Sequence, residues 1–171
     1  KIGPSESMSK SKKNTIDPEK IIKDYGADSV RLFIISDSPP EKDVQWSEEG
    51  IAASFKFIQK LWNLHFNFLD QIKLNHSSNS SNNLQKITNI FIDNVTRNLT
   101  NFSYNKIVAN FHELHSALFK ELKNKYTKSS LLENYSKILI TMSPIIPHFA
   151  NECLEILGNK DNSKWPISIK E

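Results

Sequence analysis

The sequence predicts an all-α protein, in which a bundle of four or five helices follows an extended loop and two short helices. Apolar residues recur at spacings of three and four in several long runs, as they do in amphipathic helices. Strict alternation of apolar and polar residues, which is typical of half-buried strands, is nearly absent. Hydrophobic residues make up 38% of the 171 residues, which is enough apolar mass for a single core.

The first element expected is a loop. Residues 1–16 are rich in Ser, Lys and Gly and have no apolar period, so they predict an exposed, mobile segment. A short helix is expected to begin at Pro18, because the missing N–H of proline costs nothing at the first helical position. Asp17 can cap the free amides of that helix, and Gly26 is expected to end it.

A second short helix is expected to follow directly. Asp28 is the residue predicted to cap it, and the Pro39-Pro40 pair requires it to stop earlier. Asp28 and Arg31 are three residues apart, which would allow an ion pair on this helix, with a structural role. The apolar residues of the helix are Val30, Leu32, Phe33 and Ile34.

The longest helix is expected after Trp46, with Ser47 as its cap. A polar linker, residues 75–83, should follow it, because the sequence NHSSNSSNN has no means of burying itself. The aromatic residues of the bundle sit at helical spacing, which favours core positions over base-stacking platforms. The apolar run of the long helix comprises Ile51, Phe55, Ile58, Leu61, Trp62, Phe66, Leu69 and Ile72.

Four more helices are predicted beyond the linker. Pro144 and Pro147 interrupt the pattern before the last helix, which passes through Phe149 and Leu154 and is expected to end at Gly158. The other three runs, with their core-facing residues, are 84–99 (Ile87, Ile90, Phe91 and Val95), 104–122 (Val108, Phe111, Leu114 and Leu118) and 131–142 (Leu132, Tyr135, Ile138 and Leu139).

Composition excludes several classes of protein. Cys153 is the only cysteine, so neither an internal disulfide nor a Cys-based zinc site is available, which fits the cytoplasm. No apolar run approaches the roughly 20 residues of a membrane span, so we do not expect this chain to be an integral membrane protein. The chain begins Lys-Ile-Gly-Pro, without an initiator Met or a signal-peptide pattern, and we expect it to be cut from something longer.

The segment richest in chemistry is residues 7–14, SMSKSKKN. Its three lysines and several hydroxyls suit phosphate oxygens, because a lysine is a point charge on a flexible stem and can follow a phosphate as its geometry changes. The alternative is a solvated basic loop without a role, and composition alone favours that alternative.

An ordered series of motifs changes this interpretation. Residues 7–11 resemble the K-M-S-K-S signature of class I aminoacyl-tRNA synthetases, and residues 17–32 resemble the D-P…Y-G-A-D-x-x-R-L block that follows it in the Leu, Ile, Val and Met subgroup. Residues 38–50 resemble the S-P-P-E-x-D-x-x-W-x-x-x-G stretch of bacterial-type leucyl-tRNA synthetases. The R-F dipeptide of the valyl and isoleucyl enzymes is missing near Trp46, and Leu61-Trp62 supports the leucyl branch.

The resemblance implies a C-terminal-half fragment of such an enzyme, with a bundle of the anticodon-binding type. That enzyme is a leucine–tRNA ligase, which activates leucine with ATP, Mg²⁺ being expected on the ATP phosphates, and transfers leucine to tRNA(Leu). Lys10 matches the second lysine of the signature and is the candidate catalytic residue, since a lysine that closes on the phosphates in the transition state speeds the reaction. Ser7 stands where the signature normally has its first lysine. The implied ATP-binding residues are Met8, Ser9, Lys10 and Ser11.

The basic residues of the bundle are candidate tRNA contacts. The net charge of +3 is too mild to indicate a nucleic-acid partner by itself, but residues 97–128 carry an excess of basic groups. The alternative is an ordinary solvated face. Contacts here would be to phosphates, without a base-specific pocket. The candidates are Lys12 and Lys13 of the loop, together with Arg97, Lys106, Lys120 and Lys123 of the bundle.

The histidines are interpreted structurally. His112 and His115 lie three residues apart, as two metal ligands can, but no acidic or Cys partner has matching spacing, and no metal site is expected. His148 follows Pro147 at a position that matches the family, and we expect it to orient the last helix.

The resemblance divides the chain into a signature loop with connecting helices (1–46), a helical tRNA-binding bundle (47–158) and a tail (159–171). The H-I-G-H signature and the Rossmann core are absent, so leucine and ATP would be bound through a missing catalytic core, and the isolated chain is expected to be an inactive monomer. One alternative is a free-standing helical tRNA- or RNA-binding module. A second is an unrelated helical interaction protein, which leaves the motif series unexplained.

Overall fold

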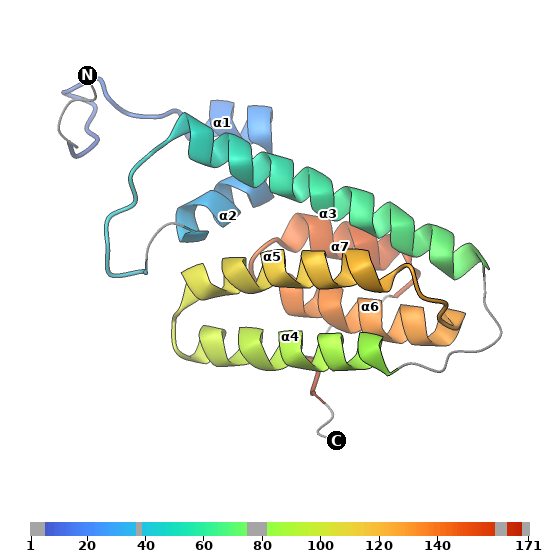
Figure 1. Cartoon of the computed structure of the whole chain (residues 1–171). Coiled ribbons are helices and arrows are strands. Elements are labelled where there is room, and N and C mark those ends of the chain that lie inside the picture. The colour runs from blue at the N-terminus through green and yellow to red at the C-terminus, as the bar shows by residue number, and fades with distance from the viewer. Residues whose placement is uncertain (1–5, 37–38, 75–81, 160–163, 169–171) are drawn as a thin grey trace.

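The computed structural model describes residues 6–36, 39–74, 82–159 and 164–168, and these fold into helices joined by turns, without strands (Figure 1). The long α3 lies across one side of the molecule, while α4 and α5 form an antiparallel hairpin beside α6 and α7. The predicted all-α bundle is thereby confirmed. The helices are α1 (Pro18–Tyr25), α2 (Ala27–Ser36), α3 (Glu48–Leu74), α4 (Asn83–Thr100), α5 (Tyr104–Glu121), α6 (Lys128–Met142) and α7 (Pro147–Ile156).

The start and end of α1 match the prediction. The Asp17 carboxylate accepts a hydrogen bond from the Glu19 amide, Pro18 takes the first helical position, and Gly26 ends the helix with a φ of 80°. A positive φ is strained for any residue with a Cβ atom, so glycine suits this turn into α2.

The prediction that Asp28 caps its own helix is wrong. Helix α2 begins at Ala27, which places Asp28 inside the first turn, where its carboxylate serves another helix. The apolar residues of α2 differ in burial: Leu32 and Phe33 are buried, whereas Ile34 is 48% exposed.

Helix α3 begins at the predicted cap. The Ser47 hydroxyl accepts a hydrogen bond from the Gly50 amide at 3.1 Å, and its carbonyl accepts one from Ile51. The predicted core position of Phe66 is wrong, because its side chain is 53% exposed. Phe55, Trp62, Leu69 and Ile72 are half-buried. The buried face of α3 consists of Ile51, Ser54, Phe57, Ile58, Leu61, Leu64, His65 and Phe68.

The predicted linker lies mostly outside the described residues, and the helices after it follow the sequence pattern closely. The core-facing residues predicted for α5 are all buried, but in α4 the predicted core residue Ile90 is 61% exposed. Helix α6 begins at Lys128, three residues earlier than predicted, because the Thr127 hydroxyl caps it through the Ser130 amide. Gly158, with a φ of 73°, closes the turn after α7.

Two apolar clusters hold the helices together. The main cluster occupies the interior of the bundle, and a smaller one consists of Ile21, Phe33 and Ile51, with Trp46 packed against it. Helix α2 contributes Leu32 to the main cluster and Phe33 to the smaller one. The N-terminal helices are therefore fixed to the bundle by α2.

Candidate functional site

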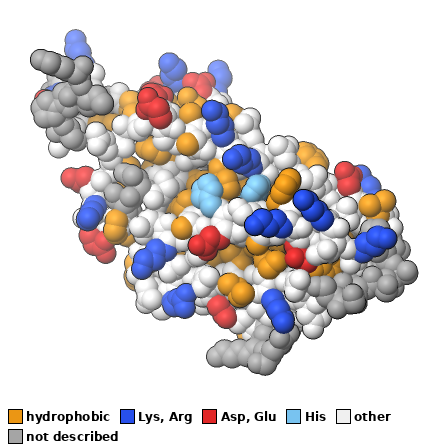
Figure 2. Space-filling model, in the orientation of Figure 1, with side chains coloured by type: hydrophobic (Ala, Val, Ile, Leu, Met, Phe, Trp, Pro, Cys, Tyr) orange, Lys and Arg blue, Asp and Glu red, His pale blue; other side chains and the backbone are white. Residues whose placement is uncertain are grey.

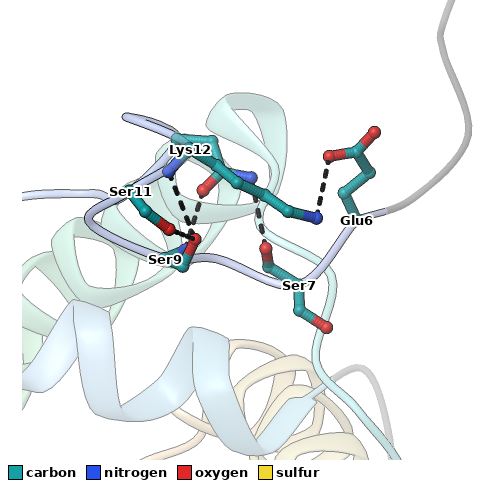
Figure 3. A network of polar contacts seen from close by, with 6 residues as sticks. Glu6, Ser7, Ser9, Ser11 and Lys12 are labelled. Atoms are coloured by element: carbon teal, nitrogen blue, oxygen red, sulfur yellow. Dashed lines mark hydrogen bonds and ion pairs between the residues drawn. The ribbon is translucent and has the colours of Figure 1, made fainter.

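The loop that carries the signature-like motif is closed by its own polar groups (Figure 3). The Ser9 amide donates to the Asn14 side-chain oxygen at 2.8 Å, and the Asn14 amide group donates to the Ser7 carbonyl at 3.3 Å. The Lys12 amide donates to the Ser9 hydroxyl, which also contacts the Ser11 hydroxyl at 3.1 Å. Sequence reasoning missed Asn14, although an Asn that tolerates turns and bonds to nearby backbone is a recognisable signal.

The lysines of this loop differ in their surroundings. Lys12 pairs with Glu6 at 3.3 Å, and both side chains are more than half exposed, so the pair contributes little to stability. Lys10 and Lys13 are exposed, and neither ammonium group has a polar partner in the described part of the chain. Met8 is 48% exposed. The loop therefore presents Lys10, which matches the second lysine of the signature, to solvent on a turn that is fixed by hydrogen bonds within the loop.

Two charged residues of α2 bind the start of α7. The Asp28 carboxylate accepts hydrogen bonds from the amides of His148 (3.3 Å) and Phe149 (2.7 Å), and it contacts the His148 ring nitrogen Nδ1 at 2.9 Å. Arg31 donates to the carbonyls of Pro144 and Ile145 at 2.9 Å each. The predicted Asp28–Arg31 ion pair is wrong, because both side chains reach across to the turn before α7.

The candidate basic residues of the bundle fall into two groups along its length. Arg97 and Lys106 lie near the turn that joins α4 to α5, whereas Lys120 and Lys123 lie at the opposite end of α5. Fourteen residues of helix separate Lys106 from Lys120, which is about 21 Å at the rise of an α-helix. All four are exposed, so the structure leaves two separate basic groups.

His112 and His115 lie on the face of α5 that meets α3. Both rings contact Phe57, with centroid distances of 3.8 and 6.0 Å. Burial lowers the pKa of both histidines. His115 lowers the pKa of His112 further, and the positive charge of Lys60 lowers that of both. A hydrogen bond to the Lys60 backbone acts in the opposite direction on His115.

Within the described ranges, no three or more His, Cys, Asp or Glu residues are grouped so as to hold a metal ion. Cys153 is fully buried, and burial raises the pKa of its thiol. No helix of the described part is long and apolar enough to cross a lipid bilayer.

Two family models match the chain. The model for class I tRNA synthetases (I, L, M and V) matches residues 4–47, and the model for the anticodon-binding domain of tRNA ligase matches residues 81–171. The first match covers the loop, α1 and α2, and the second covers α4 to α7.

Similar proteins agree with these models. The chain is 38% identical over 168 residues to a leucine–tRNA ligase from Rickettsia massiliae, and 36% identical over 180 residues to one from Allorhizobium ampelinum. These alignments cover 96% and 97% of this chain but 20% of each relative, so the chain spans about a fifth of their length.

The fold also matches a solved structure. A LeuRS from Agrobacterium radiobacter K84, in a ternary complex with tRNA and LeuAMS, superposes with a TM-score of 0.81 at 21% identity. The match covers 94% of this chain and 22% of that one. At this identity the likeness establishes the shared fold.

Proposed function

The chain belongs to the family of anticodon-binding domains of tRNA ligases, and we propose that it forms the signature-loop and tRNA-binding part of a leucine–tRNA ligase. The observation that carries the proposal is the ordered motif series of residues 7–50, which continues into a bundle of the same family. The 38% identity to leucine–tRNA ligases over nearly the whole chain supports leucine as the amino acid.

Lys10 is the residue we assign to catalysis. Attack of the leucine carboxylate on the α-phosphate of ATP releases pyrophosphate and spreads negative charge over the departing oxygens. An exposed lysine on a closed turn can approach those oxygens as the charge develops, and this lowers the barrier. Mg²⁺ on the ATP phosphates belongs to the same proposal.

The neighbours of Lys10 have supporting roles in this proposal. Ser9 and Ser11 shape the loop and offer hydroxyls to phosphate, while Met8, which is about half exposed here, packs against the catalytic body. The Lys12–Glu6 pair leaves Lys13 as the lysine better placed to substitute for the charge absent at Ser7.

The bundle is proposed to contact tRNA(Leu) through phosphates. Its candidate residues form two groups, one with Arg97 and Lys106 and one with Lys120 and Lys123. We propose three functional segments, namely residues 1–46 for the loop and connecting helices, 47–158 for the bundle and 159–171 for a tail. The longer protein would act as a monomer in the cytoplasm, and leucine and ATP would bind to its other parts.

Two measurements on the isolated chain test whether it binds tRNA by itself and whether it needs the rest of the enzyme to activate leucine. Fluorescence anisotropy with labelled tRNA(Leu) is expected to show binding that weakens steeply between 50 and 200 mM salt, because neutralised phosphates release counterions. Leucine-dependent exchange of ATP with pyrophosphate is expected to be undetectable. Salt-independent binding would argue against phosphate contacts, and exchange by the pure chain would show that this segment is catalytically complete.

A further inference from the structure

One cationic surface of the bundle includes none of the candidate tRNA contacts. It consists of Lys60 on α3 and of His112 and His115 on α5, and we call it the Lys–His patch. Both histidine rings rest on Phe57, which is only 4% exposed, so the packing of α3 against α5 fixes their positions. Figure 2 shows histidine side chains on this face of the molecule, with Lys and Arg side chains around them.

The patch continues along α5 into a hollow. The ring of Phe119, 55% exposed, is stacked on His115 with a centroid distance of 6.3 Å and an interplanar angle of 11°. Phe119 also lines an open depression of about 310 Å³ between the ends of α3 and α5, together with Asn67 and Lys123. The α3–α5 face therefore combines cations, exposed imidazole edges and an exposed aromatic ring.

Carboxylates close to the patch are engaged elsewhere. Glu113, next to His112 in the sequence, accepts a hydrogen bond from Asn110 and lines the hollow between α4 and α5. Asp70, which also lines the depression, pairs with Lys73 at 3.3 Å. The charged group that acts on both histidines is Lys60.

Charged groups on the other helices packed against α5 also have partners of their own. Helices α2 and α4 both contact α5. In α2, Asp28 binds the first turn of α7 and Arg31 binds carbonyls before it. In α4, Asp93 is bonded to Ser168 and Arg97 to Asn94. Lys56 lies one helical turn before Lys60 on α3, Lys120 follows Phe119 on α5, and both lysines are exposed.

We propose that the Lys–His patch binds a phosphate of tRNA, and that this contact takes up protons, so that tRNA binding strengthens as the pH falls below 7.5. The proposal rests on the proposed tRNA-binding function and assigns part of it to a defined face. It adds Lys60, His112 and His115 to the tRNA contacts, and none of these was a candidate from charge along the sequence.

The proton uptake follows from the surroundings of the two rings. In the free chain, burial on Phe57 and repulsion by Lys60 lower the pKa of both histidines below the ordinary value, and His115 lowers that of His112 further, so the neutral form of each predominates at pH 7.5. A phosphate placed against the imidazoles stabilises their protonated form and raises the pKa of each. A group with a higher pKa in the complex than in the free chain binds a proton on association. Each such proton strengthens binding by at most about tenfold per pH unit.

The test measures tRNA affinity against pH at constant ionic strength. The 171-residue chain is titrated into labelled tRNA(Leu) from pH 6.0 to 8.0, and we expect the Kd to fall several-fold per pH unit. In a His112→Asn/His115→Asn variant, the Kd at pH 8.0 should stay within about twofold of the wild type, while most of the pH dependence disappears. Circular dichroism checks that the variant keeps its helices.

A second variant tests the charge in the patch without altering the packed rings. Lys60→Gln should weaken binding at every pH, and in the free chain it should raise the pKa of both histidines measured by NMR, because the repulsion is removed. Lys125→Gln, an exposed lysine outside the patch, makes the same change in charge and should leave both histidine pKa values unaltered.

The outcomes separate this proposal from the proposed function. Salt-sensitive tRNA binding that is independent of pH, or that keeps its pH dependence in the double variant, would overturn the Lys–His patch and leave the proposed function intact. Absence of tRNA binding at every pH would count against both. Stronger pH-linked binding to polyglutamate than to tRNA would assign the face to an acidic protein and overturn an RNA contact.

Discussion

Asp28 joins two helices that lie 120 residues apart in the sequence. Its side chain is largely buried, and it satisfies the amides of His148 and Phe149 at the start of α7, where the positive end of the helix dipole favours a carboxylate. The same pair of residues, Asp28 and His148, lies within stretches that resemble the family. Their contact attaches α2 to α7, which is a physical reason for these two residues to occur together.

Substitution of Asp28 tests the strength of this attachment. Asp28→Ala leaves two amides at the start of α7 without their acceptor, and we expect a loss of about 1–3 kcal/mol in the free energy of unfolding. Urea unfolding followed by circular dichroism measures it. Asp24→Ala, at an exposed position of α1, is the matched control and should have little effect. Equal stability of the two variants would show that Asp28 does not hold α7.

The buried His65 makes the free energy of unfolding depend on pH. It is fully buried, with Nδ1 at 3.1 Å from the Tyr135 hydroxyl, and burial lowers its pKa below the ordinary value. As the pH falls below about 6.5, His65 is therefore protonated in the unfolded chain before it is protonated in the folded chain. Folding becomes less favourable as the pH falls below that value. His112 and His115 shift in the same direction and add to the effect.

The contribution of His65 is separable by substitution. His65→Phe removes the titrating group. It also removes one of the hydrogen-bond partners of the Tyr135 hydroxyl, which keeps its contact with the Cys153 thiol, and that loss is the same at both pH values. We expect the difference in unfolding free energy between pH 7.5 and pH 5.5 to be smaller in this variant than in the wild type. An unchanged difference would mean that His65 does not titrate differently in the folded and unfolded chains.

Gly50 matters for the packing of α3 against α2. A Cβ atom at this position would lie 2.6 Å from an edge carbon of the Phe33 ring, closer than real contacts allow. Phe33 is 4% exposed and packs edge-on against Trp46 at a centroid distance of 5.2 Å, so the ring has little room to move. The glycine that ends the leucyl-type stretch thus allows α3 to approach α2 closely.

Gly50→Ala should therefore destabilise the chain, despite the helix preference of alanine. Displacing the ring destabilises the fold by about 1–3 kcal/mol. The higher helix propensity of alanine over glycine stabilises it by at most about 1 kcal/mol. Thermal unfolding is expected to occur at a lower temperature. In a Phe33→Leu background the same substitution should be neutral or stabilising, and a similar loss in both backgrounds would exclude the contact with Phe33 as the cause.

Apolar residues three and four apart located the longer helices of the described chain, whereas α1 was located by the signals at its ends, Asp17, Pro18 and Gly26. Periodicity was less accurate about which apolar residues are buried. Phe66 and Ile90 continue the pattern of their helices, yet both are exposed, since burial depends on where neighbouring helices end. The cap of α6 at Thr127 was missed because Lys128, Ser129 and Ser130 carry no apolar signal.

At the scale of the whole molecule, the sequence identified the loop and the bundle but not their connections. The polar groups that fix α2 to α7 lie more than 110 residues apart, and no local pattern predicts such a contact. Charge counted along the sequence also says nothing about positions in space, since Lys106 and Lys120 lie toward opposite ends of α5. The Lys–His patch depends on the packing of α3 against α5, which periodicity alone does not specify.

The central claim is that this chain supplies the loop that closes on ATP during leucine activation, and it is tested in the full-length protein that contains the chain. The measurement is leucine-dependent exchange of ATP with pyrophosphate by the wild type, by Lys10→Ala and by Lys20→Ala, an exposed lysine of α1. We predict that Lys10→Ala lowers kcat about 10²–10³-fold with little change in the KM for leucine, and that Lys20→Ala keeps the wild-type rate. A kcat unchanged by Lys10→Ala would contradict this account.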